Sequence, residues 1–208
     1  MARQGILLVV SGFSGAGKGT IMKALLEKYE NYALSVSATT RSPRTGEVDG
    51  REYFFKTKEA FEEMIEQNAL IEYACYVGNY YGTPRAYVEE QLALGKDVVL
   101  EIEIQGARKI KERFPEAVLL FISPPSAQEL KNRLLNRGTE SLEVIESRLA
   151  RAAEEAVGID EYDYFVINDV VDACVEQVHQ IVQSERAKAS RCMDLIQTIE
   201  AQVKAFQR

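Results

Sequence analysis

Cysteine and histidine are scarce in this chain of 208 residues, which contains three cysteines and one histidine. Cys75, Cys174 and Cys192 are odd in number and have no metal-ligand spacing, so we expect reduced thiols in a cytoplasmic protein. A disulfide scaffold and a zinc site are both disfavoured. His179 falls within a predicted helix, and we interpret it as a structural residue without a catalytic role.

Long apolar runs and an excess of basic residues are also missing. Apolar runs such as 6–10 are far shorter than the roughly 20 residues that a transmembrane helix needs. Arg3 leads through a short apolar run into a glycine-rich loop without a cleavage site, so we expect no secretory signal. With 25 basic against 32 acidic residues, the net charge is −7, and we expect neither a nucleic-acid nor a membrane partner.

The sequence does contain a regular alternation of strand-like and helical patterns. Most strand-like runs are nearly continuous in apolar residues, which is typical of parallel strands covered on both faces. The alternation predicts an α/β fold with a mostly parallel sheet and helices on both faces. The predicted strands are 6–10, 33–38, 71–77, 97–102, 117–122 and 164–167. The predicted helices are 18–29, 58–67, 84–94, 126–136, 141–157 and 170–190.

A glycine-rich loop follows the first predicted strand and opens the first predicted helix. Glycines there let backbone N–H groups turn inward around a phosphate, and the helix N-terminus favours negative charge. Lys18 supplies a positive charge for the β- and γ-phosphates. This P-loop pattern predicts ATP binding by Gly12, Phe13, Ser14, Gly15, Ala16, Gly17, Lys18, Gly19 and Thr20.

The residue after Lys18 departs from the common P-loop pattern. Gly19 stands where Ser or Thr normally ligates Mg²⁺, and Thr20 comes one position later. We expect Mg²⁺ as the cofactor that accompanies ATP. Because this ion dehydrates reluctantly, we expect ATP phosphates and water to hold it.

A P-loop does not identify the phosphate acceptor, but a polar segment at 35–81 interrupts the alternation and is more specific. Arg41 and Arg44 bracket a proline turn and Tyr53 follows, so two guanidinium groups and a phenol are available to grip a phosphomonoester. Taken alone, the same arginines also fit a solvated surface.

Together these segments resemble guanylate kinase, a P-loop nucleoside-monophosphate kinase family. The resemblance rests on Thr-Thr-Arg-x-Pro-Arg-x-Gly-Glu at 39–47, Gly-Asn-Tyr-Tyr-Gly-Thr at 78–83 and Glu-Ile-Glu-Ile-Gln-Gly at 101–106. It runs from the P-loop to Asn168 and Asp169 and so covers nearly the whole chain. It implies that ATP phosphorylates GMP, and dGMP, to the diphosphate, and that ATP and GMP are the small-molecule partners.

The resemblance also implies which residues hold GMP. Glu72 suits this role, because guanine presents N1–H and N2–H₂ donors that adenine lacks. The GMP phosphate is expected at Arg41, Arg44, Tyr53 and Tyr81. The guanine base is expected at Ser37, Glu72, Thr83 and Glu103.

On the ATP side, the resemblance implies contacts from Arg133, Asn168 and Asp169. The GMP phosphate is already largely ionised at pH 7, so positioning and charge stabilisation suffice for catalysis. The expected catalytic residues are Lys18, Arg44, Arg137 and Arg148.

The chain departs from the family at 101–103. It has Glu-Ile-Glu where many members have Asp-x-Asp, which keeps the charge and changes the reach. Glu101 is the one candidate side chain for Mg²⁺, through water, and no metal ligand is assigned as certain.

The resemblance gives a single domain, 1–208. Its core is 1–34, 95–125 and 164–208, with a GMP-binding insertion at about 35–94 and an arginine-bearing lid at about 126–163. Two other functions stay open: a non-catalytic guanylate-kinase-like interaction module, and a different nucleoside-monophosphate kinase such as an adenylate kinase. A GTPase is disfavoured because no Asn-Lys-x-Asp motif occurs.

The segment 192–206 has apolar residues at helical spacing. We expect this helix to pack on the protein's own core, the alternative being a partner helix. The sequence gives neither the oligomeric state nor the regulation, so protein partners and a homo-oligomer both stay open. The apolar residues are Met193, Leu195, Ile196, Ile199, Val203 and Phe206.

Overall fold

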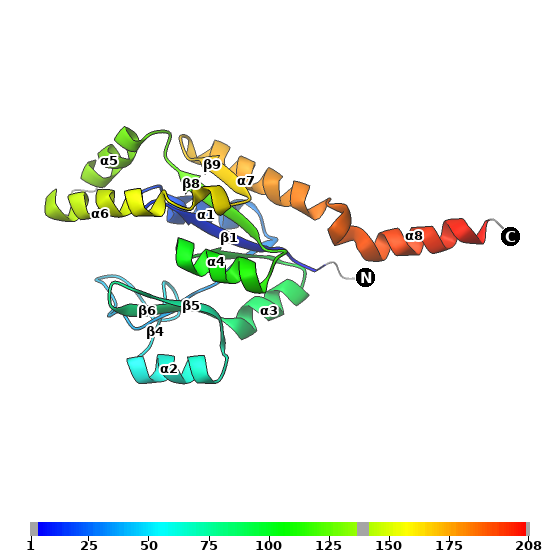
Figure 1. The fold of residues 1–208 in the computed structure, drawn as a ribbon, viewed down its shortest axis with the longest axis horizontal. Helices are drawn as coiled ribbons and strands as arrows, with labels where there is room; N and C mark the ends of the chain where they lie inside the picture. Colours follow the sequence, from blue (N-terminus) through cyan, green and yellow to red (C-terminus); the bar gives the residue numbers. More distant parts are fainter. Residues whose placement is uncertain (1–3, 137–141, 207–208) are drawn as a thin grey trace.

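In the computed structural model, which describes residues 4–136 and 142–206, a five-stranded parallel sheet forms the centre of the molecule (Figure 1). The strand order is β2-β7-β1-β8-β9, so the chain crosses the sheet through helices, as predicted. The strands are β1 (Leu7–Gly12), β2 (Tyr32–Leu34), β7 (Asp97–Glu101), β8 (Val118–Ser123) and β9 (Tyr164–Ile167).

Helices cover both faces of this sheet, which explains the continuous apolar runs. One face packs against α1 (Lys18–Lys28) and α7 (Val171–Arg186), in a core that contains Leu8, Ile21 and Val178. The other face packs against α3 (Arg85–Ala93) and α4 (Ile104–Arg113), in a core that contains Val9, Val88 and Ile110. The predicted α/β fold with helices on both faces is therefore confirmed.

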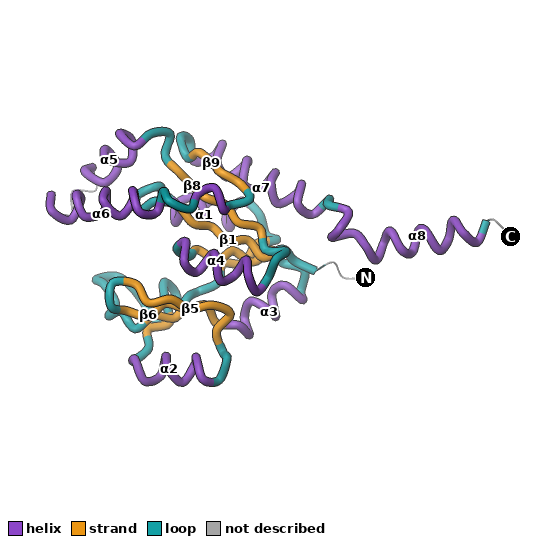
Figure 2. The backbone as a smooth tube through the Cα atoms, in the orientation of Figure 1, coloured by secondary structure: helices purple, strands orange, loops and turns teal. Residues whose placement is uncertain are grey.

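A second, smaller sheet lies beside the first (Figure 2). It is mixed, with the strand order β4-β3-β6-β5, and Phe61 of the helix α2 (Lys58–Glu66) is buried against it. β5 and β6 form a hairpin whose two turn residues, Val77 and Gly78, both have positive φ, as a tight primed turn requires. The strands are β3 (Ala38–Thr39), β4 (Phe54–Phe55), β5 (Leu70–Tyr76) and β6 (Asn79–Pro84).

The described part of the predicted lid contains the helices α5 (Ala127–Asn136) and α6 (Leu142–Glu155) and the short helix η1 (Ile159–Glu161). The helices α5 and α6 share a small apolar cluster that includes Leu130 and Ile145. The connection at 137–141, and with it the predicted catalytic residue Arg137, lies outside the described residues.

The sequence patterns did not predict α4, whose ten residues have polar or charged side chains over most of the surface and only a narrow buried stripe. The expected insertion at 35–94 includes α3, and Val88 of α3 is fully buried in the core that packs on the main sheet.

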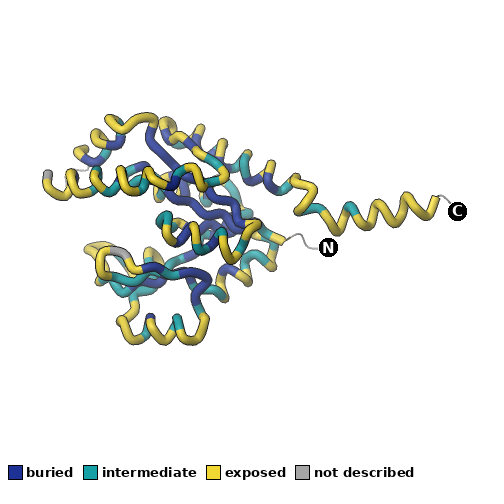
Figure 3. The backbone as a smooth tube through the Cα atoms, viewed as in Figure 1, coloured by how far each residue is buried: buried dark blue, intermediate teal, exposed yellow. Residues whose placement is uncertain are grey.

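The expectation for the last helix is wrong. α8 (Met193–Ala205) has no buried residue and extends away from the body of the molecule (Figures 1 and 3). The place on the sheet that it would need is already covered by α7, through Val175, Val178 and Val182. The helical spacing of the apolar residues predicted that this segment is a helix, but it could not predict whether the helix packs on the body of the protein.

Within 4–136 and 142–206, no helix combines the length and the apolar character that crossing a bilayer requires.

A buried carboxylate at the start of β7 joins three parts of the core. Asp97 is fully buried and accepts hydrogen bonds from the Ile6 backbone N–H at 2.9 Å and from Asn31 Nδ2 at 2.8 Å. It also forms an ion pair with Arg186 at the end of α7. One side chain thereby fixes the edge between β1, the loop before β2 and the helix that leads to α8.

We expect Asp97→Ala to lower the free energy of unfolding by about 3–5 kcal/mol, because it removes the acceptor of the buried Ile6 N–H and the carboxylate that pairs with Arg186. Urea unfolding followed by circular dichroism measures this. Asp194→Ala, on the exposed face of α8, is the matched control and should change stability by less than about 0.5 kcal/mol. Equal losses in the two variants would refute the assignment.

Candidate active site

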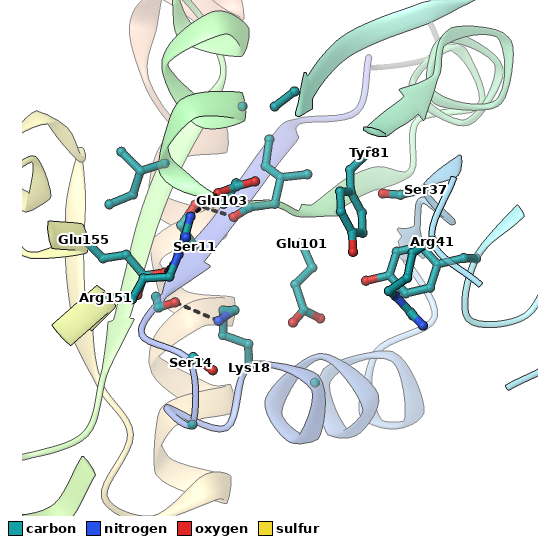
Figure 4. A pocket seen from close by; sticks show the side chains of 18 of the residues that line it. Ser11, Ser14, Lys18, Ser37, Arg41, Tyr81, Glu101, Glu103, Arg151 and Glu155 are labelled. Carbon is teal, nitrogen blue, oxygen red and sulfur yellow. Dashed lines mark hydrogen bonds and ion pairs between the residues drawn. The ribbon is translucent and has the colours of Figure 1, made fainter. Parts of the chain in front are cut away.

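A cleft of about 570 Å³ opens where the carboxyl ends of the parallel strands face the small sheet. Ligands of open α/β sheets bind at this edge. The P-loop closes one side of the cleft and the small sheet the other, while α6 contributes Arg148, Arg151 and Glu155. Figure 4 shows Lys18 on the first side, Arg41 and Tyr81 on the second.

The P-loop is held in shape by a side chain from the far end of the sheet. Gly17 has a φ of 89°, and a Cβ there would lie 2.6 Å from Asn168 Nδ2. Asn168 follows β9, is buried, and donates from Nδ2 to the Ala16 carbonyl at 2.8 Å. Only glycine fits at position 17, so the loop sequence and Asn168 determine one backbone conformation together.

Lys18 lies across the loop that it belongs to. Its Nζ donates to the carbonyl oxygens of Gly12, at 2.7 Å, and Phe13, at 3.3 Å. The ammonium group is thereby positioned where the backbone N–H groups of the loop and the N-terminus of α1 converge.

Two predicted arginines connect the lid to the P-loop. Arg148 of α6 donates to Ser14 Oγ at 3.2 Å and lines the cleft. Arg133 of α5 instead donates to the Asn168 carbonyl at 2.9 Å and pairs with Glu129. Arg133 therefore does not line the cleft, and it supports the P-loop indirectly through Asn168.

On the small-sheet side, Arg41 is held by a carboxylate that we did not predict. Its Nη2 donates to both oxygens of Glu47, at 2.9 and 3.0 Å, and its guanidinium stacks 5.3 Å above the Tyr53 ring. Glu47 also accepts from the Arg44 backbone N–H. Tyr53 and Tyr81 pack edge to face, so the four predicted phosphate residues form one cluster on the cleft wall.

Deeper in the cleft, two neighbouring strands pair a carboxylate with a hydroxyl. Glu72 on β5 lies directly opposite Thr83 on β6, and Thr83 Oγ1 donates to Glu72 Oε1 at 2.7 Å. Both residues are buried, and burial raises the pKa of Glu72. Gly106 of α4 allows this packing, because a Cβ there would lie 3.0 Å from Glu72 Oε2.

Glu101, the last residue of β7, and Glu103, directly before α4, both line the cleft. Figure 4 shows Glu101 between Lys18 and Tyr81. The side chain of Glu101 is open to the cleft, but the protein around it displaces enough water for desolvation to raise its pKa. The nearby positive charge of Lys18 acts in the opposite direction and lowers the pKa. Desolvation likewise raises the pKa of Glu103 to about 7, against the opposing charge of Arg151. Arg151 Nη2 lies 3.6 Å from Glu103 Oε2.

Arg151 and Glu155 are cleft residues that the sequence analysis missed. They follow Arg148 by three and seven positions, so all three lie on one face of α6. That spacing was the signal that could have found them. Arg151 also pairs with Glu155 at 3.8 Å, so the lid side of the cleft carries two positive charges and one negative charge.

The structure thus brings most of the predicted residues together, but not all. Within the described part of the chain, the predicted residues that do not line the cleft are Phe13, Ala16, Thr83, Arg133, Asn168 and Asp169. Those that line it are Gly12, Ser14, Gly15, Gly17, Lys18, Gly19, Thr20, Ser37, Arg41, Arg44, Tyr53, Glu72, Tyr81, Glu101, Glu103 and Arg148.

Comparisons with known proteins agree with this arrangement. The sequence model of the guanylate kinase family matches residues 4–185. The chain is 54% identical over 193 residues to the guanylate kinase of Caldanaerobacter subterraneus subsp. tengcongensis, covering 93% of this chain and 94% of that protein. It is 54% identical over 194 residues to that of Clostridioides difficile, covering 93% and 95%. The crystal structure of guanylate kinase from Anaplasma phagocytophilum superposes with a TM-score of 0.75 at 34% identity, covering 90% of this chain and 89% of that one.

The raised pKa of Glu103 predicts how the stability of the ligand-free protein depends on pH. The folded chain binds this proton more tightly than the unfolded chain, so stability falls as pH rises from about 4.5 to 7. Glu103→Gln removes that loss and should be more stable than wild type by about 1–3 kcal/mol at pH 8, with no gain at pH 4.5.

Urea unfolding at both pH values measures this difference. Glu154→Gln, at an exposed position on α6, is the control and should follow wild type at each pH. A gain for Glu103→Gln that is the same at pH 4.5 and pH 8 would contradict the assignment.

Proposed function

The chain belongs to the guanylate kinase family and catalyses the ATP-dependent phosphorylation of GMP to GDP, and we propose that the two sides of the cleft divide this reaction. ATP binds on the P-loop side and GMP on the small-sheet side. The observation that carries this division is the distribution of charge. Lys18 and the start of α1 lie on one wall, and the Arg41 cluster lies on the other together with Glu72, which Thr83 holds from outside the cleft lining.

On the ATP side, the P-loop backbone and Lys18 hold the β- and γ-phosphates. In this proposal, Arg133 and Asn168 do not contact ATP directly but hold the P-loop in shape. Both residues stabilise the loop, Asn168 through Ala16 and Arg133 through the Asn168 carbonyl. Asp169 remains a candidate for the adenine end.

On the GMP side, Glu72 reads guanine. One carboxylate oxygen accepts from Thr83, which fixes the rotamer and leaves the second oxygen for the N1–H and N2–H₂ groups of the base. Thr83 is therefore a positioning residue, and Ser37 and Glu103 are the further candidates for contact with the base. The phosphate lies at Arg41, Arg44, Tyr53 and Tyr81.

The transfer itself needs positioning and charge. The acceptor oxygen of GMP is ionised at pH 7, so no general base has to remove a proton. Lys18, Arg44 and Arg148 surround the transferring group, and Arg137 is the further predicted member. Because Glu47 already orients Arg41, GMP binds to an arginine whose side chain has little remaining freedom to lose.

The family uses Mg²⁺ with ATP, and the residues present fit that ion. Within 4–136 and 142–206, no group of three or more His, Cys, Asp or Glu side chains forms a metal cage. Glu101 is a cleft carboxylate that interacts with Lys18, which suits an ion that keeps its water and binds mainly through phosphates. When bound, Mg²⁺ neutralises charge on the β- and γ-phosphates.

We treat the chain as a single domain in which the small sheet and the lid close over the two nucleotides. The helix α6 lines the cleft with Arg148, Arg151 and Glu155. Movement of this helix would therefore bring these side chains closer to the bound nucleotides. Closure excludes water, which limits the hydrolysis of ATP.

A coupled assay with AMP, GMP, dGMP, CMP and UMP as acceptors tests the proposal. Wild type should prefer GMP over AMP by about 10⁴-fold in kcat/KM, because AMP leaves Glu72 unpaired. It should accept dGMP, because every residue placed on GMP contacts the base or the phosphate. Equal use of AMP and GMP would refute the assignment of the guanine site.

Glu72→Gln should lower kcat/KM for GMP by about 10²–10³-fold, since it removes the charged acceptor of a buried hydrogen-bonded pair. Activity with AMP, and the KM for ATP, should change little. Glu66→Gln, exposed at the end of α2, is the matched control. If Glu72→Gln retained full selectivity for GMP, the reader of the base would have to be Ser37 or Glu103.

We expect substitutions of Arg148 and Arg41 to change different kinetic parameters. Arg148→Ala should lower kcat by about 10³-fold, because it stabilises charge that spreads over the transferring phosphoryl group. Arg41→Ala should mainly raise the KM for GMP, because it holds the phosphate in the ground state and the transition state alike. Single-turnover rates measure both effects, with Lys131→Ala on the exposed side of α5 as the control. An unchanged kcat in Arg148→Ala would remove α6 from the mechanism.

A further inference from the structure

Arg151 lies on the boundary between two cavities. It lines the substrate cleft, and it also lines a smaller cavity of about 210 Å³ between the start of α4 and the end of α6. The side chain is 32% exposed, so close packing does not hold it in one position. Figure 4 shows it extending from the lid side of the cleft towards Glu103. Its position must therefore depend on its charged neighbours.

Two carboxylates lie beside the guanidinium group of Arg151. Nη2 lies 3.6 Å from Glu103 Oε2, and Nε lies 3.8 Å from Glu155 Oε1. Glu155 is the last residue of α6, whereas Glu103 lies between β7 and α4. Arg151 therefore connects an acid of the lid with an acid at the end of the main sheet.

The lid end of this connection is attached to the P-loop. The Ser14 backbone donates a hydrogen bond to Glu155, and the Ser14 hydroxyl accepts one from Arg148. Because Glu155 and Arg148 both belong to α6, these bonds hold the helix against the loop on either side of Arg151. Arg151 is thereby presented to Glu103 from a defined direction, which would change if α6 moved.

Glu103 needs a partner that orients its side chain before a ligand arrives. It replaces the second aspartate of the Asp-x-Asp pattern, and glutamate has an additional rotatable bond whose freedom is lost on binding. The other carboxylate proposed to face the base, Glu72, is already oriented by the hydrogen bond from Thr83. For Glu103, the ion pair with Arg151 has the corresponding effect. An acceptor that is oriented in advance binds its donor at a smaller entropic cost.

We propose that Arg151 is a specificity-determining residue, which positions Glu103 to accept a hydrogen bond from the 2-amino group of guanine. This inference rests on the proposed binding of GMP, in which Glu72 and Glu103 both face the base. A base that lacks the 2-amino group offers Glu103 no donor at this edge. Because Arg151 belongs to the lid, this part of base recognition depends on the position of α6.

Inosine monophosphate (IMP) is the probe, because its base keeps the N1–H and O6 groups of guanine and lacks only the 2-amino group. Wild type should prefer GMP over IMP by about 10–100-fold in kcat/KM, the usual effect of one hydrogen bond to a charged group. Arg151→Gln should lower kcat/KM for GMP by about tenfold, because Glu103 is no longer oriented. The value for IMP, and the KM for ATP, should change little.

Three further variants show whether the effect passes through Glu103. Arg108→Gln is the matched control, because Arg108 lines the smaller cavity but pairs with Glu161 and does not line the cleft. It should keep the wild-type ratio of GMP to IMP. Arg151→Lys should retain most of the ratio, since it keeps the charge and the contact with Glu103 is not bidentate. In a Glu103→Gln background, Arg151→Gln should lower the ratio no further.

Equal losses with GMP and IMP in Arg151→Gln would overturn the proposal, because they would assign Arg151 to phosphoryl transfer or to the structure of the lid. An unchanged ratio in Arg151→Gln, or additive effects of Arg151→Gln and Glu103→Gln, would overturn it as well. The preference for GMP over AMP separates this failure from that of the proposed function. Wild type that prefers GMP over AMP, with no effect of Arg151→Gln, refutes the role of Arg151 alone, whereas equal use of AMP and GMP refutes the guanine site itself.

Discussion

The hydrogen bond from Asn168 to the Ala16 carbonyl is the contact on which the donor half of the site depends. It links the last strand of the sheet to the P-loop and occupies the space that any side chain at position 17 would need. Arg133 then attaches the lid helix α5 to the same asparagine. One buried amide therefore couples the sheet, the loop and the lid, and the geometry of the phosphate site follows from all three.

The cleft also contains several acidic side chains whose ionised forms are destabilised by desolvation in the ligand-free protein. Desolvation raises the pKa of Glu72, Glu101, Glu103 and Glu155, although positive groups lie near each of them. Such sites are where function and stability oppose each other. In the proposed mode of binding, donors on the guanine base and the cation that accompanies ATP would offset this cost. Of these acids, Glu72 belongs to the small sheet, which has its own apolar cluster around Phe61.

Much of this could be predicted from the sequence, for reasons that differ by residue. The P-loop and the buried strands are local patterns, since glycine spacing and continuous apolar runs determine them directly. The partnership of Glu72 and Thr83 depends on the register of a hairpin, which includes an irregularity between Leu70 and Glu72 and cannot be read from spacing. Glu47 belonged to a recognised motif, but its contact with Arg41 appears only when the turn at 42–46 is folded. Similarly, the amphipathic pattern of 192–206 predicted a helix correctly, while its environment depends on which surface α7 leaves uncovered.

The hydrogen bonds of Lys18 within its own loop affect the enthalpy that calorimetry would measure when a nucleotide binds. The ammonium group already has two carbonyl oxygens of its own loop as neighbours. In the proposed mode of ATP binding, an arriving phosphate would therefore replace existing bonds and would not meet an unsolvated charge. The heat released is the difference between two sets of polar contacts and should be small relative to the number of bonds in the complex. In the proposed binding mode, the two carbonyl contacts would re-form when the nucleotide leaves, so that successive ATP molecules would meet a lysine that is already in position.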